Sequence, residues 1–293
     1  MLKNFFDKIP DFFLIEITNR CNLKCPACPW HTCMTRELHD MSFEEYKQIL
    51  PKIKPYAKAV CFYVMGEPLL NPDWNQIVAV SHDAGLRTII STNGMLLESN
   101  MDRIFESGLD HLQVALDGFE AQTHGAYRRG ADFDRIVDSL TLLAQQKKAR
   151  QRLTPEVTIQ TLATRQNENQ IDSIKCFAEK LGFGFKLKKM HYGRTDDLKK
   201  KNKPLFMPQD PELVRIPGKS YYSEGESCPE MRQMVILSNG IVVPCCVDFD
   251  GAWQIGNIFK ESVEDVWFGK EHLQFVDAYE SHSNPFCESC DLC

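Results

Sequence analysis

The segment that decides the fold joins an apolar run, Phe12-Phe-Leu-Ile-Glu-Ile-Thr18, to a cysteine-rich run, Cys21-Asn-Leu-Lys-Cys25-Pro-Ala-Cys28. The apolar run predicts a buried strand, so the cysteines follow the carboxyl end of that strand. Spacings of three and then two residues let one short loop place three thiolates around one face of a [4Fe–4S] cluster. Because such a cluster is normally bound by four cysteines, one iron would keep an open position for chemistry.

Other uses of these cysteines must be weighed against that interpretation. A structural zinc site pairs two Cys or His knuckles, and His31 and Cys33 lie close enough to contribute. A disulfide framework is disfavoured, because the chain has 293 residues, an ordinary hydrophobic content of 43 % and no signal peptide. Free core thiols are the third option. The spacing alone favours iron–sulfur and leaves zinc and core thiols open.

The composition argues against nucleic-acid and membrane partners. The net charge of -6 gives no general basic field that would attract nucleic acid or anionic lipid. The basic run Leu198-Lys-Lys-Lys-Asn-Lys203 is interpreted as a solvated loop, with phosphate or acidic-substrate recognition as the alternative. No apolar stretch reaches the roughly 18 residues that span a bilayer, and residues 1–11 do not form a secretory signal. We therefore expect a cytoplasmic protein, in which 12 cysteines indicate metal or redox chemistry.

Up to about residue 190, short apolar runs alternate with amphipathic helical patterns. One helix is predicted to start behind a capping box at Ser42 and Glu45, and another to end at Gly182. Six such units predict a parallel sheet with right-handed crossovers, but six strands are too few for a closed eight-stranded barrel. The expected fold is α/β, a partial (β/α)6 TIM-type barrel with its active-site loops after the strand carboxyl ends. The predicted strands are Phe12–Thr18, Ala59–Val64, Arg87–Thr92, His111–Leu116, Glu156–Leu162 and Gly184–Met190.

Beyond this core, the sequence predicts a linker and a small C-terminal module. Residues 191–227 lose the apolar periodicity and contain several prolines, so we expect a linker over the barrel mouth. Met234–Leu237 and Ile241–Val243 flank Ser238-Asn-Gly240, which predicts a β-hairpin with a two-residue turn. A short helix is expected from Ser262. The expected division is a core over 1–190, the linker over 191–227, and a β-hairpin/helix iron–sulfur module over 228–293.

The C-terminal module holds a second group of cysteines. They are Cys228, Cys245, Cys246, Cys287, Cys290 and Cys293. One precedes the hairpin, two follow it, and the last three form a Cys-x2-Cys-x2-Cys run. Ligand spacing alone permits a zinc site as well as an iron–sulfur cluster. Cys33, Cys61 and Cys176 are interpreted as structural thiols.

Further motifs follow successive predicted strands. They are Met65-Gly66-Glu67-Pro68, Ser91-Thr-Asn93-Gly94 and Ala115-Leu-Asp117-Gly118. A fourth motif, Tyr127-Arg-Arg129-Gly130, lies further along the chain, before the fifth predicted strand. Together with the first cysteine run they resemble the radical S-adenosylmethionine superfamily, and the C-terminal cysteines resemble its SPASM/twitch extension. The resemblance implies that the open iron binds S-adenosylmethionine, which an electron from the cluster cleaves to methionine and a 5′-deoxyadenosyl radical.

The same resemblance assigns cofactor contacts to individual residues. Gly66 and Glu67 would meet the methionine ammonium, although Met65 stands where the family has a glycine. Arg129, or Arg128 in its place, would pair with the methionine carboxylate, a role that suits a bidentate arginine fork. The remaining expected cofactor contacts are Ser91, Asn93, Asp117 and Asn167.

The metal ligands are likewise implied by the resemblance. They are Cys21, Cys25 and Cys28 for the first cluster and Cys228, Cys245, Cys287 and Cys290 for an auxiliary [4Fe–4S] cluster, with Cys293 as the alternative fourth ligand. A full SPASM domain carries further cysteines and this chain ends too soon for them, so we expect two clusters in all. If the strand pleat continues past Val243, neighbouring side chains point to opposite faces. Cys246 would then turn away from the auxiliary cluster, and its thiol could donate a hydrogen atom as a catalytic residue.

The resemblance predicts a radical S-adenosylmethionine oxidoreductase or isomerase that abstracts hydrogen from an unactivated C–H bond. Dehydrogenation would follow if the auxiliary cluster accepts a second electron, and epimerisation if a thiol such as Cys246 quenches the substrate radical. Relatives of about this length with one auxiliary cluster include aminocyclitol dehydrogenases and an aminoglycoside epimerase. The favoured substrate is therefore a small sugar-like or aminocyclitol molecule, and the expected reductant is of the flavodoxin or ferredoxin type.

Two other functions stay open. Peptide-modifying relatives often carry an N-terminal leader-recognition domain, whereas only 20 residues precede Cys21 here, which makes peptide modification the second choice. An iron–sulfur electron carrier or sensor is the non-enzyme alternative, but such a protein would not need Glu67, Arg129 or an open iron. Reductive cleavage of S-adenosylmethionine to 5′-deoxyadenosine separates the enzyme from the carrier.

Overall fold

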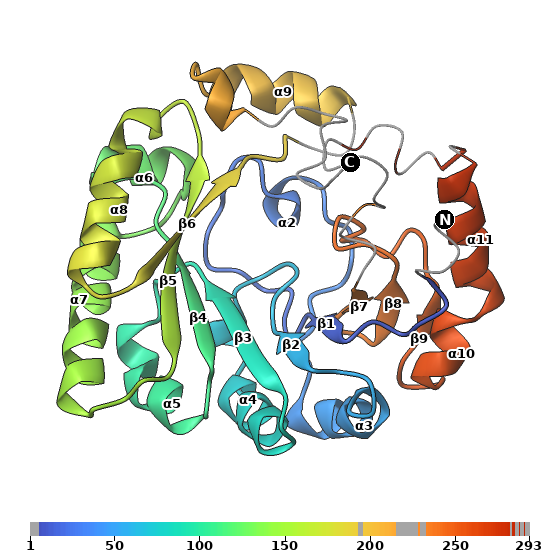
Figure 1. The fold of residues 1–293 in the computed structure, drawn as a ribbon. Helices are drawn as coiled ribbons and strands as arrows, with labels where there is room; N and C mark the ends of the chain where they lie inside the picture. The colour runs from blue at the N-terminus through green and yellow to red at the C-terminus, as the bar shows by residue number, and fades with distance from the viewer. Residues whose placement is uncertain are drawn as a thin grey trace.

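The computed structural model describes residues 6–192, 196–214, 228, 233–281, 283–284, 287 and 290. These residues form a nine-stranded sheet with the order β6-β5-β4-β3-β2-β1-β7-β8-β9 (Figure 1). Strands β1 to β6 pair in chain order and run parallel, which confirms the predicted partial (β/α)6 barrel. The strands are β1 (Phe12–Ile15), β2 (Ala59–Cys61), β3 (Arg87–Thr92), β4 (His111–Ala115), β5 (Glu156–Ala163), β6 (Gly184–Lys189), β7 (Met234–Ile236), β8 (Ile241–Val243) and β9 (Gly256–Asn257).

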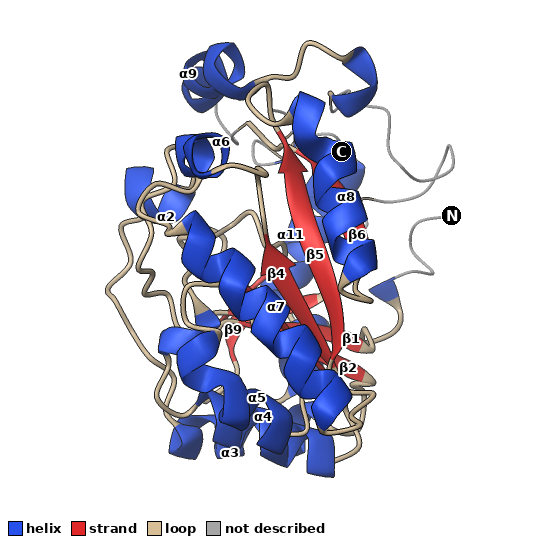
Figure 2. Ribbon diagram, turned by 90° about the vertical axis from the view of Figure 1, so that its left-hand side faces the viewer, coloured by secondary structure: helices blue, strands red, loops and turns tan. Residues whose placement is uncertain are grey.

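A layer of helices covers the outer face of the sheet (Figure 2). The Ser42 hydroxyl accepts from Glu45 N and the Glu45 side chain accepts in return, so the predicted capping box is present. Gly182, with φ of 73°, follows the end of α8 as predicted. No helix in the described ranges is long and apolar enough to cross a membrane. The helices are α2 (Pro29–Thr32), α3 (Phe43–Ile53), α4 (Trp74–Asp83), α5 (Met101–Glu106), α6 (Ala121–Tyr127), α7 (Phe133–Ala149), α8 (Ile171–Lys180), α9 (Asp196–Phe206), α10 (Val263–Trp267) and α11 (Lys270–Glu280), with short 3-10 turns η1 (Pro68–Leu70), η2 (Glu98–Asn100), η3 (Glu168–Gln170) and η4 (Pro211–Leu213).

The two faces of the sheet bury different sets of side chains. Alternate strand residues such as Phe13, Val60 and Ile90 join the helices in the main core. Their neighbours in the chain point the other way, because side chains alternate along a strand. Leu14 and Cys61 accordingly belong to a separate, smaller apolar cluster, which lies on the inner face of the curved sheet. The sheet thus has an outer face that packs against the helices and an inner face with its own apolar cluster.

The C-terminal hairpin extends the same sheet. Strand β7 pairs in parallel with β1 on the side opposite β2, and β8 returns antiparallel to β7. The predicted two-residue turn is wrong in length, because the register pairs Ile236 with Val242 and leaves three residues, 238–240, beyond the Leu237–Ile241 hydrogen bond. Gly240 closes this turn with φ of 81°, a conformation that favours glycine. Helix α10 starts behind a capping box at Ser262, as predicted.

The segment expected to be an irregular linker contains a helix. Helix α9 spans Asp196–Phe206 and includes the lysine run, which was expected to be a loop. Its last residue, Phe206, packs against Tyr127 with 5.4 Å between ring centroids, beside Cys25. This contact attaches α9 to the first cysteine loop. Residues 193–195 and 215–227 of the expected linker lie outside the described residues.

Candidate functional site

The first cysteine loop follows β1 and is held by neighbouring strand ends. Glu67 N, just past β2, donates to Arg20 O at 2.7 Å. Lys24 N, inside the loop, donates to Arg129 O at 2.9 Å. Backbone groups from two distant segments therefore fix the path of the loop on both sides of Cys21.

The three thiols of this loop lie together and are withdrawn from water. Cys25 is buried, and Cys21 and Cys28 are partly buried, against a cluster that includes Leu23 and Met190. Burial raises the pKa of Cys21 and of Cys28 to about 11. Desolvated thiols of this kind give up their protons when they bind a metal, since the thiolate is the ligand. The donor set therefore fits a thiolate-bound cluster.

An iron–sulfur cluster and a single zinc ion require different ligand arrangements. Among the residues that the structure describes, no three His, Cys, Asp or Glu side chains converge on one metal position. Zinc ligands surround one point, whereas each thiolate of a [4Fe–4S] cluster binds a different iron. His31 and Cys33, which the zinc alternative would recruit, are both exposed.

Arg128 is the arginine whose side chain lies beside the cysteines. Its Nε donates to Asp117 Oδ2 at 2.6 Å, and the side chains are 20 % and 0 % exposed, respectively. Burial would lower the pKa of Arg128, but the charges of Asp117, Cys25 and Tyr127 and the Asp117 hydrogen bond together outweigh it and raise that pKa. Burial raises the pKa of Cys25, and the charge and hydrogen bond of Arg128 oppose that rise. Arg129 is exposed and contributes its carbonyl to the loop, so the structure favours Arg128 over Arg129 as the cationic group of the site.

Gly66 and Glu67 form the backbone support of the site. A Cβ at Gly66, where φ is 78°, would lie 2.5 Å from Thr18 O and 2.8 Å from Arg20 O. Only glycine therefore fits against the start of the cysteine loop. The buried Glu67 carboxylate accepts hydrogen bonds from Thr92 Oγ1 and from Asn93 N, both at 2.7 Å. Burial raises the pKa of Glu67, and these hydrogen bonds oppose the rise.

The other expected cofactor residues also connect strand ends. Asn93 Nδ2 donates to Asn22 Oδ1 in the cysteine loop at 2.7 Å. Asp117 Oδ1 accepts from Leu162 N at 2.6 Å, in addition to its bond with Arg128. The buried Asn167 amide donates to the main-chain oxygens of Asp117 and Leu162 at 3.1 and 2.8 Å. Ser91 lies half-buried on β3. The motifs thus form a polar network beneath the cysteine loop.

The expected auxiliary ligands lie close to one another in the described part of the module. The hydrogen bond with Cys246 and burial raise the pKa of Cys245 well above its ordinary value, and a nearby Cys228 contributes. Burial raises the pKa of Cys287 to about 12, with further contributions from Cys290 and Cys228. Cys290 Sγ lies 4.0 Å from His191 Nε2. Cys293 lies outside the described residues.

Cys246 does not occupy the position that a continued pleat would give it. Strand β8 ends at Val243, and the Cys245 and Cys246 thiols hydrogen-bond to each other instead of pointing to opposite faces. Cys246 nevertheless packs against the inner-face cluster around Leu14 and Cys61. Its thiol therefore lies between the auxiliary cysteines and the inside of the barrel.

Sequence reasoning missed a buried ion pair that links both cysteine regions. Glu16 carries on from β1, and its carboxylate binds Arg36 in a bidentate pair at 2.8 and 2.9 Å. The carboxylate also accepts from Met65 N and from Ser238 N, both at 3.2 Å. Arg36 Nε donates to Phe249 O, just past the hairpin, at 2.5 Å. The sequence feature that could have indicated this ion pair is Glu16 itself, the one acidic residue within the apolar run Phe12–Thr18.

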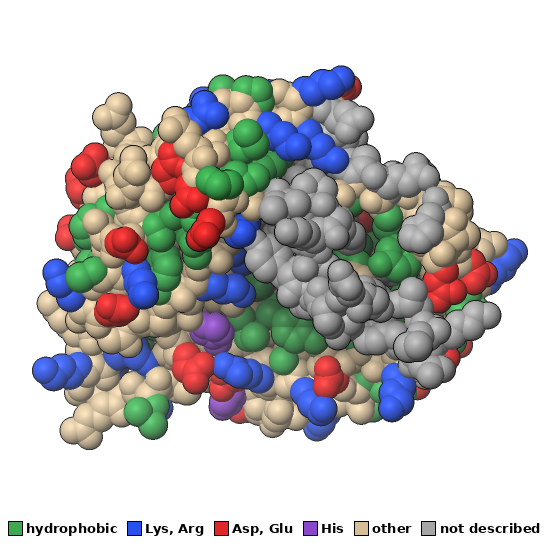
Figure 3. All heavy atoms as spheres, turned by 45° about the horizontal axis from the view of Figure 1, so that its top comes forward, with side chains coloured by type: hydrophobic (Ala, Val, Ile, Leu, Met, Phe, Trp, Pro, Cys, Tyr) green, Lys and Arg blue, Asp and Glu red, His purple; other side chains and the backbone are tan. Residues whose placement is uncertain are grey.

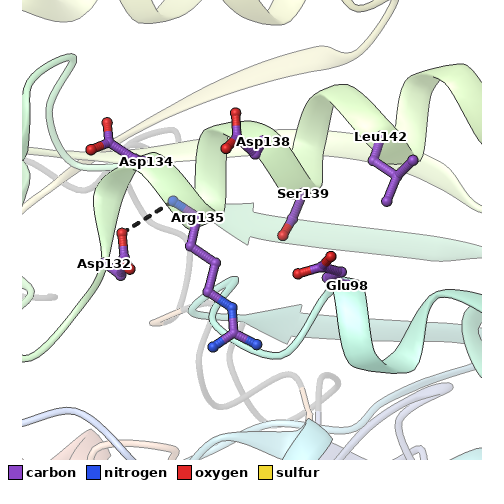
Figure 4. A pocket seen from close by; sticks show the side chains of 7 residues that line it. All are labelled: Glu98, Asp132, Asp134, Arg135, Asp138, Ser139 and Leu142. Atoms are coloured by element: carbon purple, nitrogen blue, oxygen red, sulfur yellow. Dashed lines mark hydrogen bonds between the residues drawn. The ribbon is translucent and has the colours of Figure 1, made fainter.

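A hollow on the outer surface is separate from this site. It is lined by Glu98 and by residues around the start of α7, which are Asp132, Asp134, Arg135, Asp138, Ser139 and Leu142 (Figure 4). The Asp132 side chain accepts from Arg135 N and caps the helix. The carboxylates therefore belong to a capped, solvated helix end on the outer layer, and we assign no function to them.

A parallel partial barrel with three desolvated cysteines at its strand ends defines a class of enzymes that bind a cluster with an open iron. Comparison with known families gives the same result. The model of the radical SAM superfamily matches residues 15–175, and that of SPASM, an iron–sulfur cluster-binding domain, matches residues 228–293. The chain belongs to the radical SAM superfamily and carries a C-terminal SPASM module. Its cofactors are S-adenosylmethionine and [4Fe–4S] clusters.

Two curated relatives illustrate the range of similar proteins. An AdoMet-dependent heme synthase of Methanosarcina barkeri (strain Fusaro / DSM 804) is 31 % identical over 137 residues, which cover 46 % of this chain and 39 % of that protein. The chain therefore matches less than half the length of that relative. The second relative is a protein of Pyrococcus furiosus described as a tungsten-containing aldehyde ferredoxin oxidoreductase cofactor-modifying protein. It is 23 % identical to this chain, and the alignment covers 96 % of this chain and 87 % of that protein.

Solved structures share the fold at low identity. BtrN, in a crystal structure with AdoMet and 2-DOIA, superposes with a TM-score of 0.63 at 20 % identity, over 97 % of this chain and 93 % of BtrN. SuiB of Streptococcus suis, bound to S-adenosylmethionine, superposes with a TM-score of 0.70 at 19 % identity, over 99 % of this chain and 74 % of SuiB. These likenesses establish the complete architecture, including the C-terminal module.

Proposed function

We propose that this chain is an oxidoreductase or isomerase that removes hydrogen from an unactivated C–H bond of a small sugar-like or aminocyclitol molecule. The observation that carries the proposal is the group of three desolvated thiols at the strand ends, with the Arg128–Asp117 pair against Cys25. An electron carrier has no use for a buried, oriented guanidinium beside an open iron. A flavodoxin- or ferredoxin-type protein would supply the electron.

The residues of the site divide the work between binding and orientation. Cys21, Cys25 and Cys28 would hold the first cluster through three of its irons. With S-adenosylmethionine bound at the open iron, this cofactor pair supplies a 5′-deoxyadenosyl radical. Arg128 would bind the methionine carboxylate, because a guanidinium group offers charge-assisted donors beyond the Nε that binds Asp117. The main chain at Gly66 would face the methionine ammonium.

The auxiliary module would hold the second cluster through Cys228, Cys245, Cys287 and Cys290. The position of Cys246 supports a thiol that reaches the inside of the barrel, where it would return a hydrogen atom to the substrate. With that role the reaction is an epimerisation, and without it a dehydrogenation. Peptide modification is the second candidate, supported by fold likeness to SuiB, which was also solved bound to the precursor peptide SuiA.

The proposal is tested with anaerobically reconstituted protein and a panel of sugars and aminocyclitols in deuterated water. We expect 5′-deoxyadenosine to form with the true substrate in amounts that match its product. An epimerised product would gain a solvent-derived deuterium, because a cysteine thiol exchanges with water, and a dehydrogenated product would not. A protein that binds its clusters but forms no 5′-deoxyadenosine with strong reductant would be a carrier.

A further inference from the structure

His124 is a buried histidine that hydrogen-bonds to both members of the Arg128–Asp117 ion pair. It lies on α6 and is 0 % exposed. Its ring Nδ1 accepts a hydrogen bond from Asp117 N at 3.1 Å. Its main-chain oxygen accepts a hydrogen bond from Arg128 N at 2.9 Å. One residue thus holds the main chain of both charged partners.

The hydrogen bond from Asp117 N determines the tautomer of the His124 ring. Burial lowers the pKa of His124 to about 4, so the imidazole is neutral near pH 7 and carries a single N–H. Because Nδ1 accepts from Asp117, the hydrogen is on Nε2. This Nε2 is buried and has no hydrogen-bond partner among the residues that the structure describes.

This Nε2–H indicates that the ring is not retained for packing alone. A buried donor without an acceptor is costly, and a phenyl ring of similar size would avoid that cost. Apolar packing is available at this position, because the His124 ring lies 5.9 Å from the Phe133 ring between centroids. The group that a phenyl ring lacks is the Nδ1 acceptor. The specific contribution of His124 is therefore its hydrogen bond with Asp117 N.

Each polar group of Asp117 has a partner, and His124 supplies one of them. The carboxylate accepts hydrogen bonds from Arg128 Nε and from Leu162 N, both at 2.6 Å. The main-chain oxygen accepts from Asn167 Nδ2 at 3.1 Å, and the main-chain N–H donates to His124. Because the Asp side chain is short, a shift of the Asp117 main chain would displace the carboxylate and the guanidinium that it binds.

The turn after Asp117 lies tightly against α6. A Cβ at Gly118 would be 2.4 Å from His124 N and 2.8 Å from Thr123 C. Real side chains do not approach a main chain so closely, so this contact requires glycine. The close approach of the two segments places the His124 ring within hydrogen-bonding distance of Asp117 N.

Within this series of contacts, the exposed member is Arg128. Its side chain is 20 % exposed, whereas the Asp117 side chain and His124 are 0 % exposed. Seen with the top of Figure 1 tilted forward, the molecule is hollowed near its centre, where Lys and Arg side chains border hydrophobic ones (Figure 3). A ligand can therefore reach Arg128, while His124 lies behind the ion pair.

We propose that His124 is a positioning residue for the binding of S-adenosylmethionine. It fixes the main chain of Asp117, and Asp117 in turn orients the Arg128 guanidinium beside Cys25 toward the methionine carboxylate. His124 acts through these two residues and not by contact with the cofactor. This inference rests on the proposed role of Arg128 in binding that carboxylate.

The test measures equilibrium binding of S-adenosylmethionine to reconstituted protein of equal iron content. His124→Phe keeps the ring volume but removes the acceptor, and it should bind roughly tenfold more weakly. His124→Asn keeps an acceptor oxygen in place of Nδ1 and should bind within about threefold of wild type. The control is His272→Phe, which should bind with wild-type affinity. His272 is also buried, and its Nδ1 hydrogen-bonds to Trp267 O at 2.6 Å in the C-terminal module.

A double variant separates positioning from general destabilisation. In the Arg128→Gln background, His124→Phe should cause no further loss of affinity, because the group through which it acts has been removed. A general structural defect would weaken binding by a similar factor in both backgrounds. If His124→Phe does not fold, His124→Asn is compared with His124→Gln, whose amide replaces Nε2 and not Nδ1. The Asn variant should then bind more tightly than the Gln variant.

Wild-type affinity of His124→Phe would overturn the proposal. So would an undiminished effect of that substitution in the Arg128→Gln background, or equal affinities of the Asn and Gln variants. The proposed role of Arg128 is checked in the same titrations. Wild-type affinity of Arg128→Gln would refute that role and the inference with it, whereas a loss in Arg128→Gln without a loss in His124→Phe would refute only the role of His124.

Discussion

Arg128 and Arg129 are neighbours in the chain and lie in opposite environments. Because Arg128 faces Cys25 and Arg129 faces solvent, Arg128→Gln should weaken S-adenosylmethionine binding by about 1.5–3 kcal/mol, the value of a charge-assisted hydrogen bond. Arg129→Gln, the matched control, should bind with wild-type affinity. Equilibrium binding to reconstituted protein of equal iron content measures both. If only Arg129→Gln lost affinity for S-adenosylmethionine, Arg129 would be the residue that binds the methionine carboxylate, as first predicted from the sequence.

Cys246 decides between the two proposed reactions. If it donates hydrogen, Cys246→Ala should still form 5′-deoxyadenosine and abstract hydrogen from substrate, yet give no inverted product. If it only packs on the inner-face cluster, turnover should stay within a few-fold of wild type, because a half-buried thiol without a chemical role is removed. Chiral chromatography of the product distinguishes these outcomes. Cys176→Ala, an exposed thiol on α8, is the control.

At this scale the sequence identified positions better than contacts. The motif Tyr127-Arg-Arg-Gly predicted a cofactor-binding arginine at this turn, but the direction of each arginine side chain depends on how α6 ends. Arg128 is its C-cap, with φ of -87° and ψ of 63°. Asn167 was predicted to contact the cofactor, and in the structure its amide donates to the main-chain oxygens of Asp117 and Leu162. Propensity and spacing contain no information about such turns.

Among the structural elements, the turn after β2 depends on one glycine. Gly66→Ala places a Cβ against two main-chain oxygens, whereas Gly85→Ala, also at positive φ, meets nothing within 4 Å. Gly85→Ala should cost only the left-handed penalty of about 1–2 kcal/mol. Gly66→Ala should cost more and should also weaken S-adenosylmethionine binding. Denaturant midpoints and binding titrations test this, and equal effects of the two variants would show that the contact with the cysteine loop is unimportant.

The Glu16–Arg36 pair joins β1, the cysteine loop and the hairpin. Arg36→Met leaves a buried carboxylate without its cation, which should lower the free energy of unfolding by about 3–5 kcal/mol. Arg20→Met is the control, because the Arg20–Asp40 pair is 47 % and 30 % exposed and contributes about 0–1 kcal/mol. Chemical unfolding of both variants at equal cluster loading gives the comparison. If the two variants have similar free energies of unfolding, the hydrogen bonds from Met65 N and Ser238 N are sufficient to stabilise the buried Glu16 carboxylate without Arg36.

Elements with a strong apolar period were predicted well, and the others were not. All six core strands start at the predicted residue, because each is a short segment with apolar residues at consecutive or alternate positions between turn signals. Helix α9 was missed since its surface is mostly lysine and polar, Pro204 interrupts its pattern, and its contact with the cysteine region is made through Phe206. The hairpin turn differed by one residue, because Gly240 at positive φ allows a three-residue loop.

For the whole molecule, the main result is that both cysteine groups are carried by one sheet. Strand β1 leads into the first cysteine loop and pairs on its other side with β7 of the C-terminal hairpin. The sequence suggested a separate module, because pairing between strands so far apart in the chain leaves no local signal. The continuous sheet therefore places the strand that leads into the first cysteine loop beside the hairpin that leads to Cys245.

The most direct test of this account counts iron and 5′-deoxyadenosine together in anaerobically purified protein. Wild type should contain about eight irons per chain, and replacement of Cys21, Cys25 and Cys28 by Ala should leave about four. That variant should form no 5′-deoxyadenosine, while a control with Cys33→Ala and Cys176→Ala should match wild type in both quantities. Zinc in place of iron, or undiminished 5′-deoxyadenosine formation after loss of the three cysteines, would contradict the account.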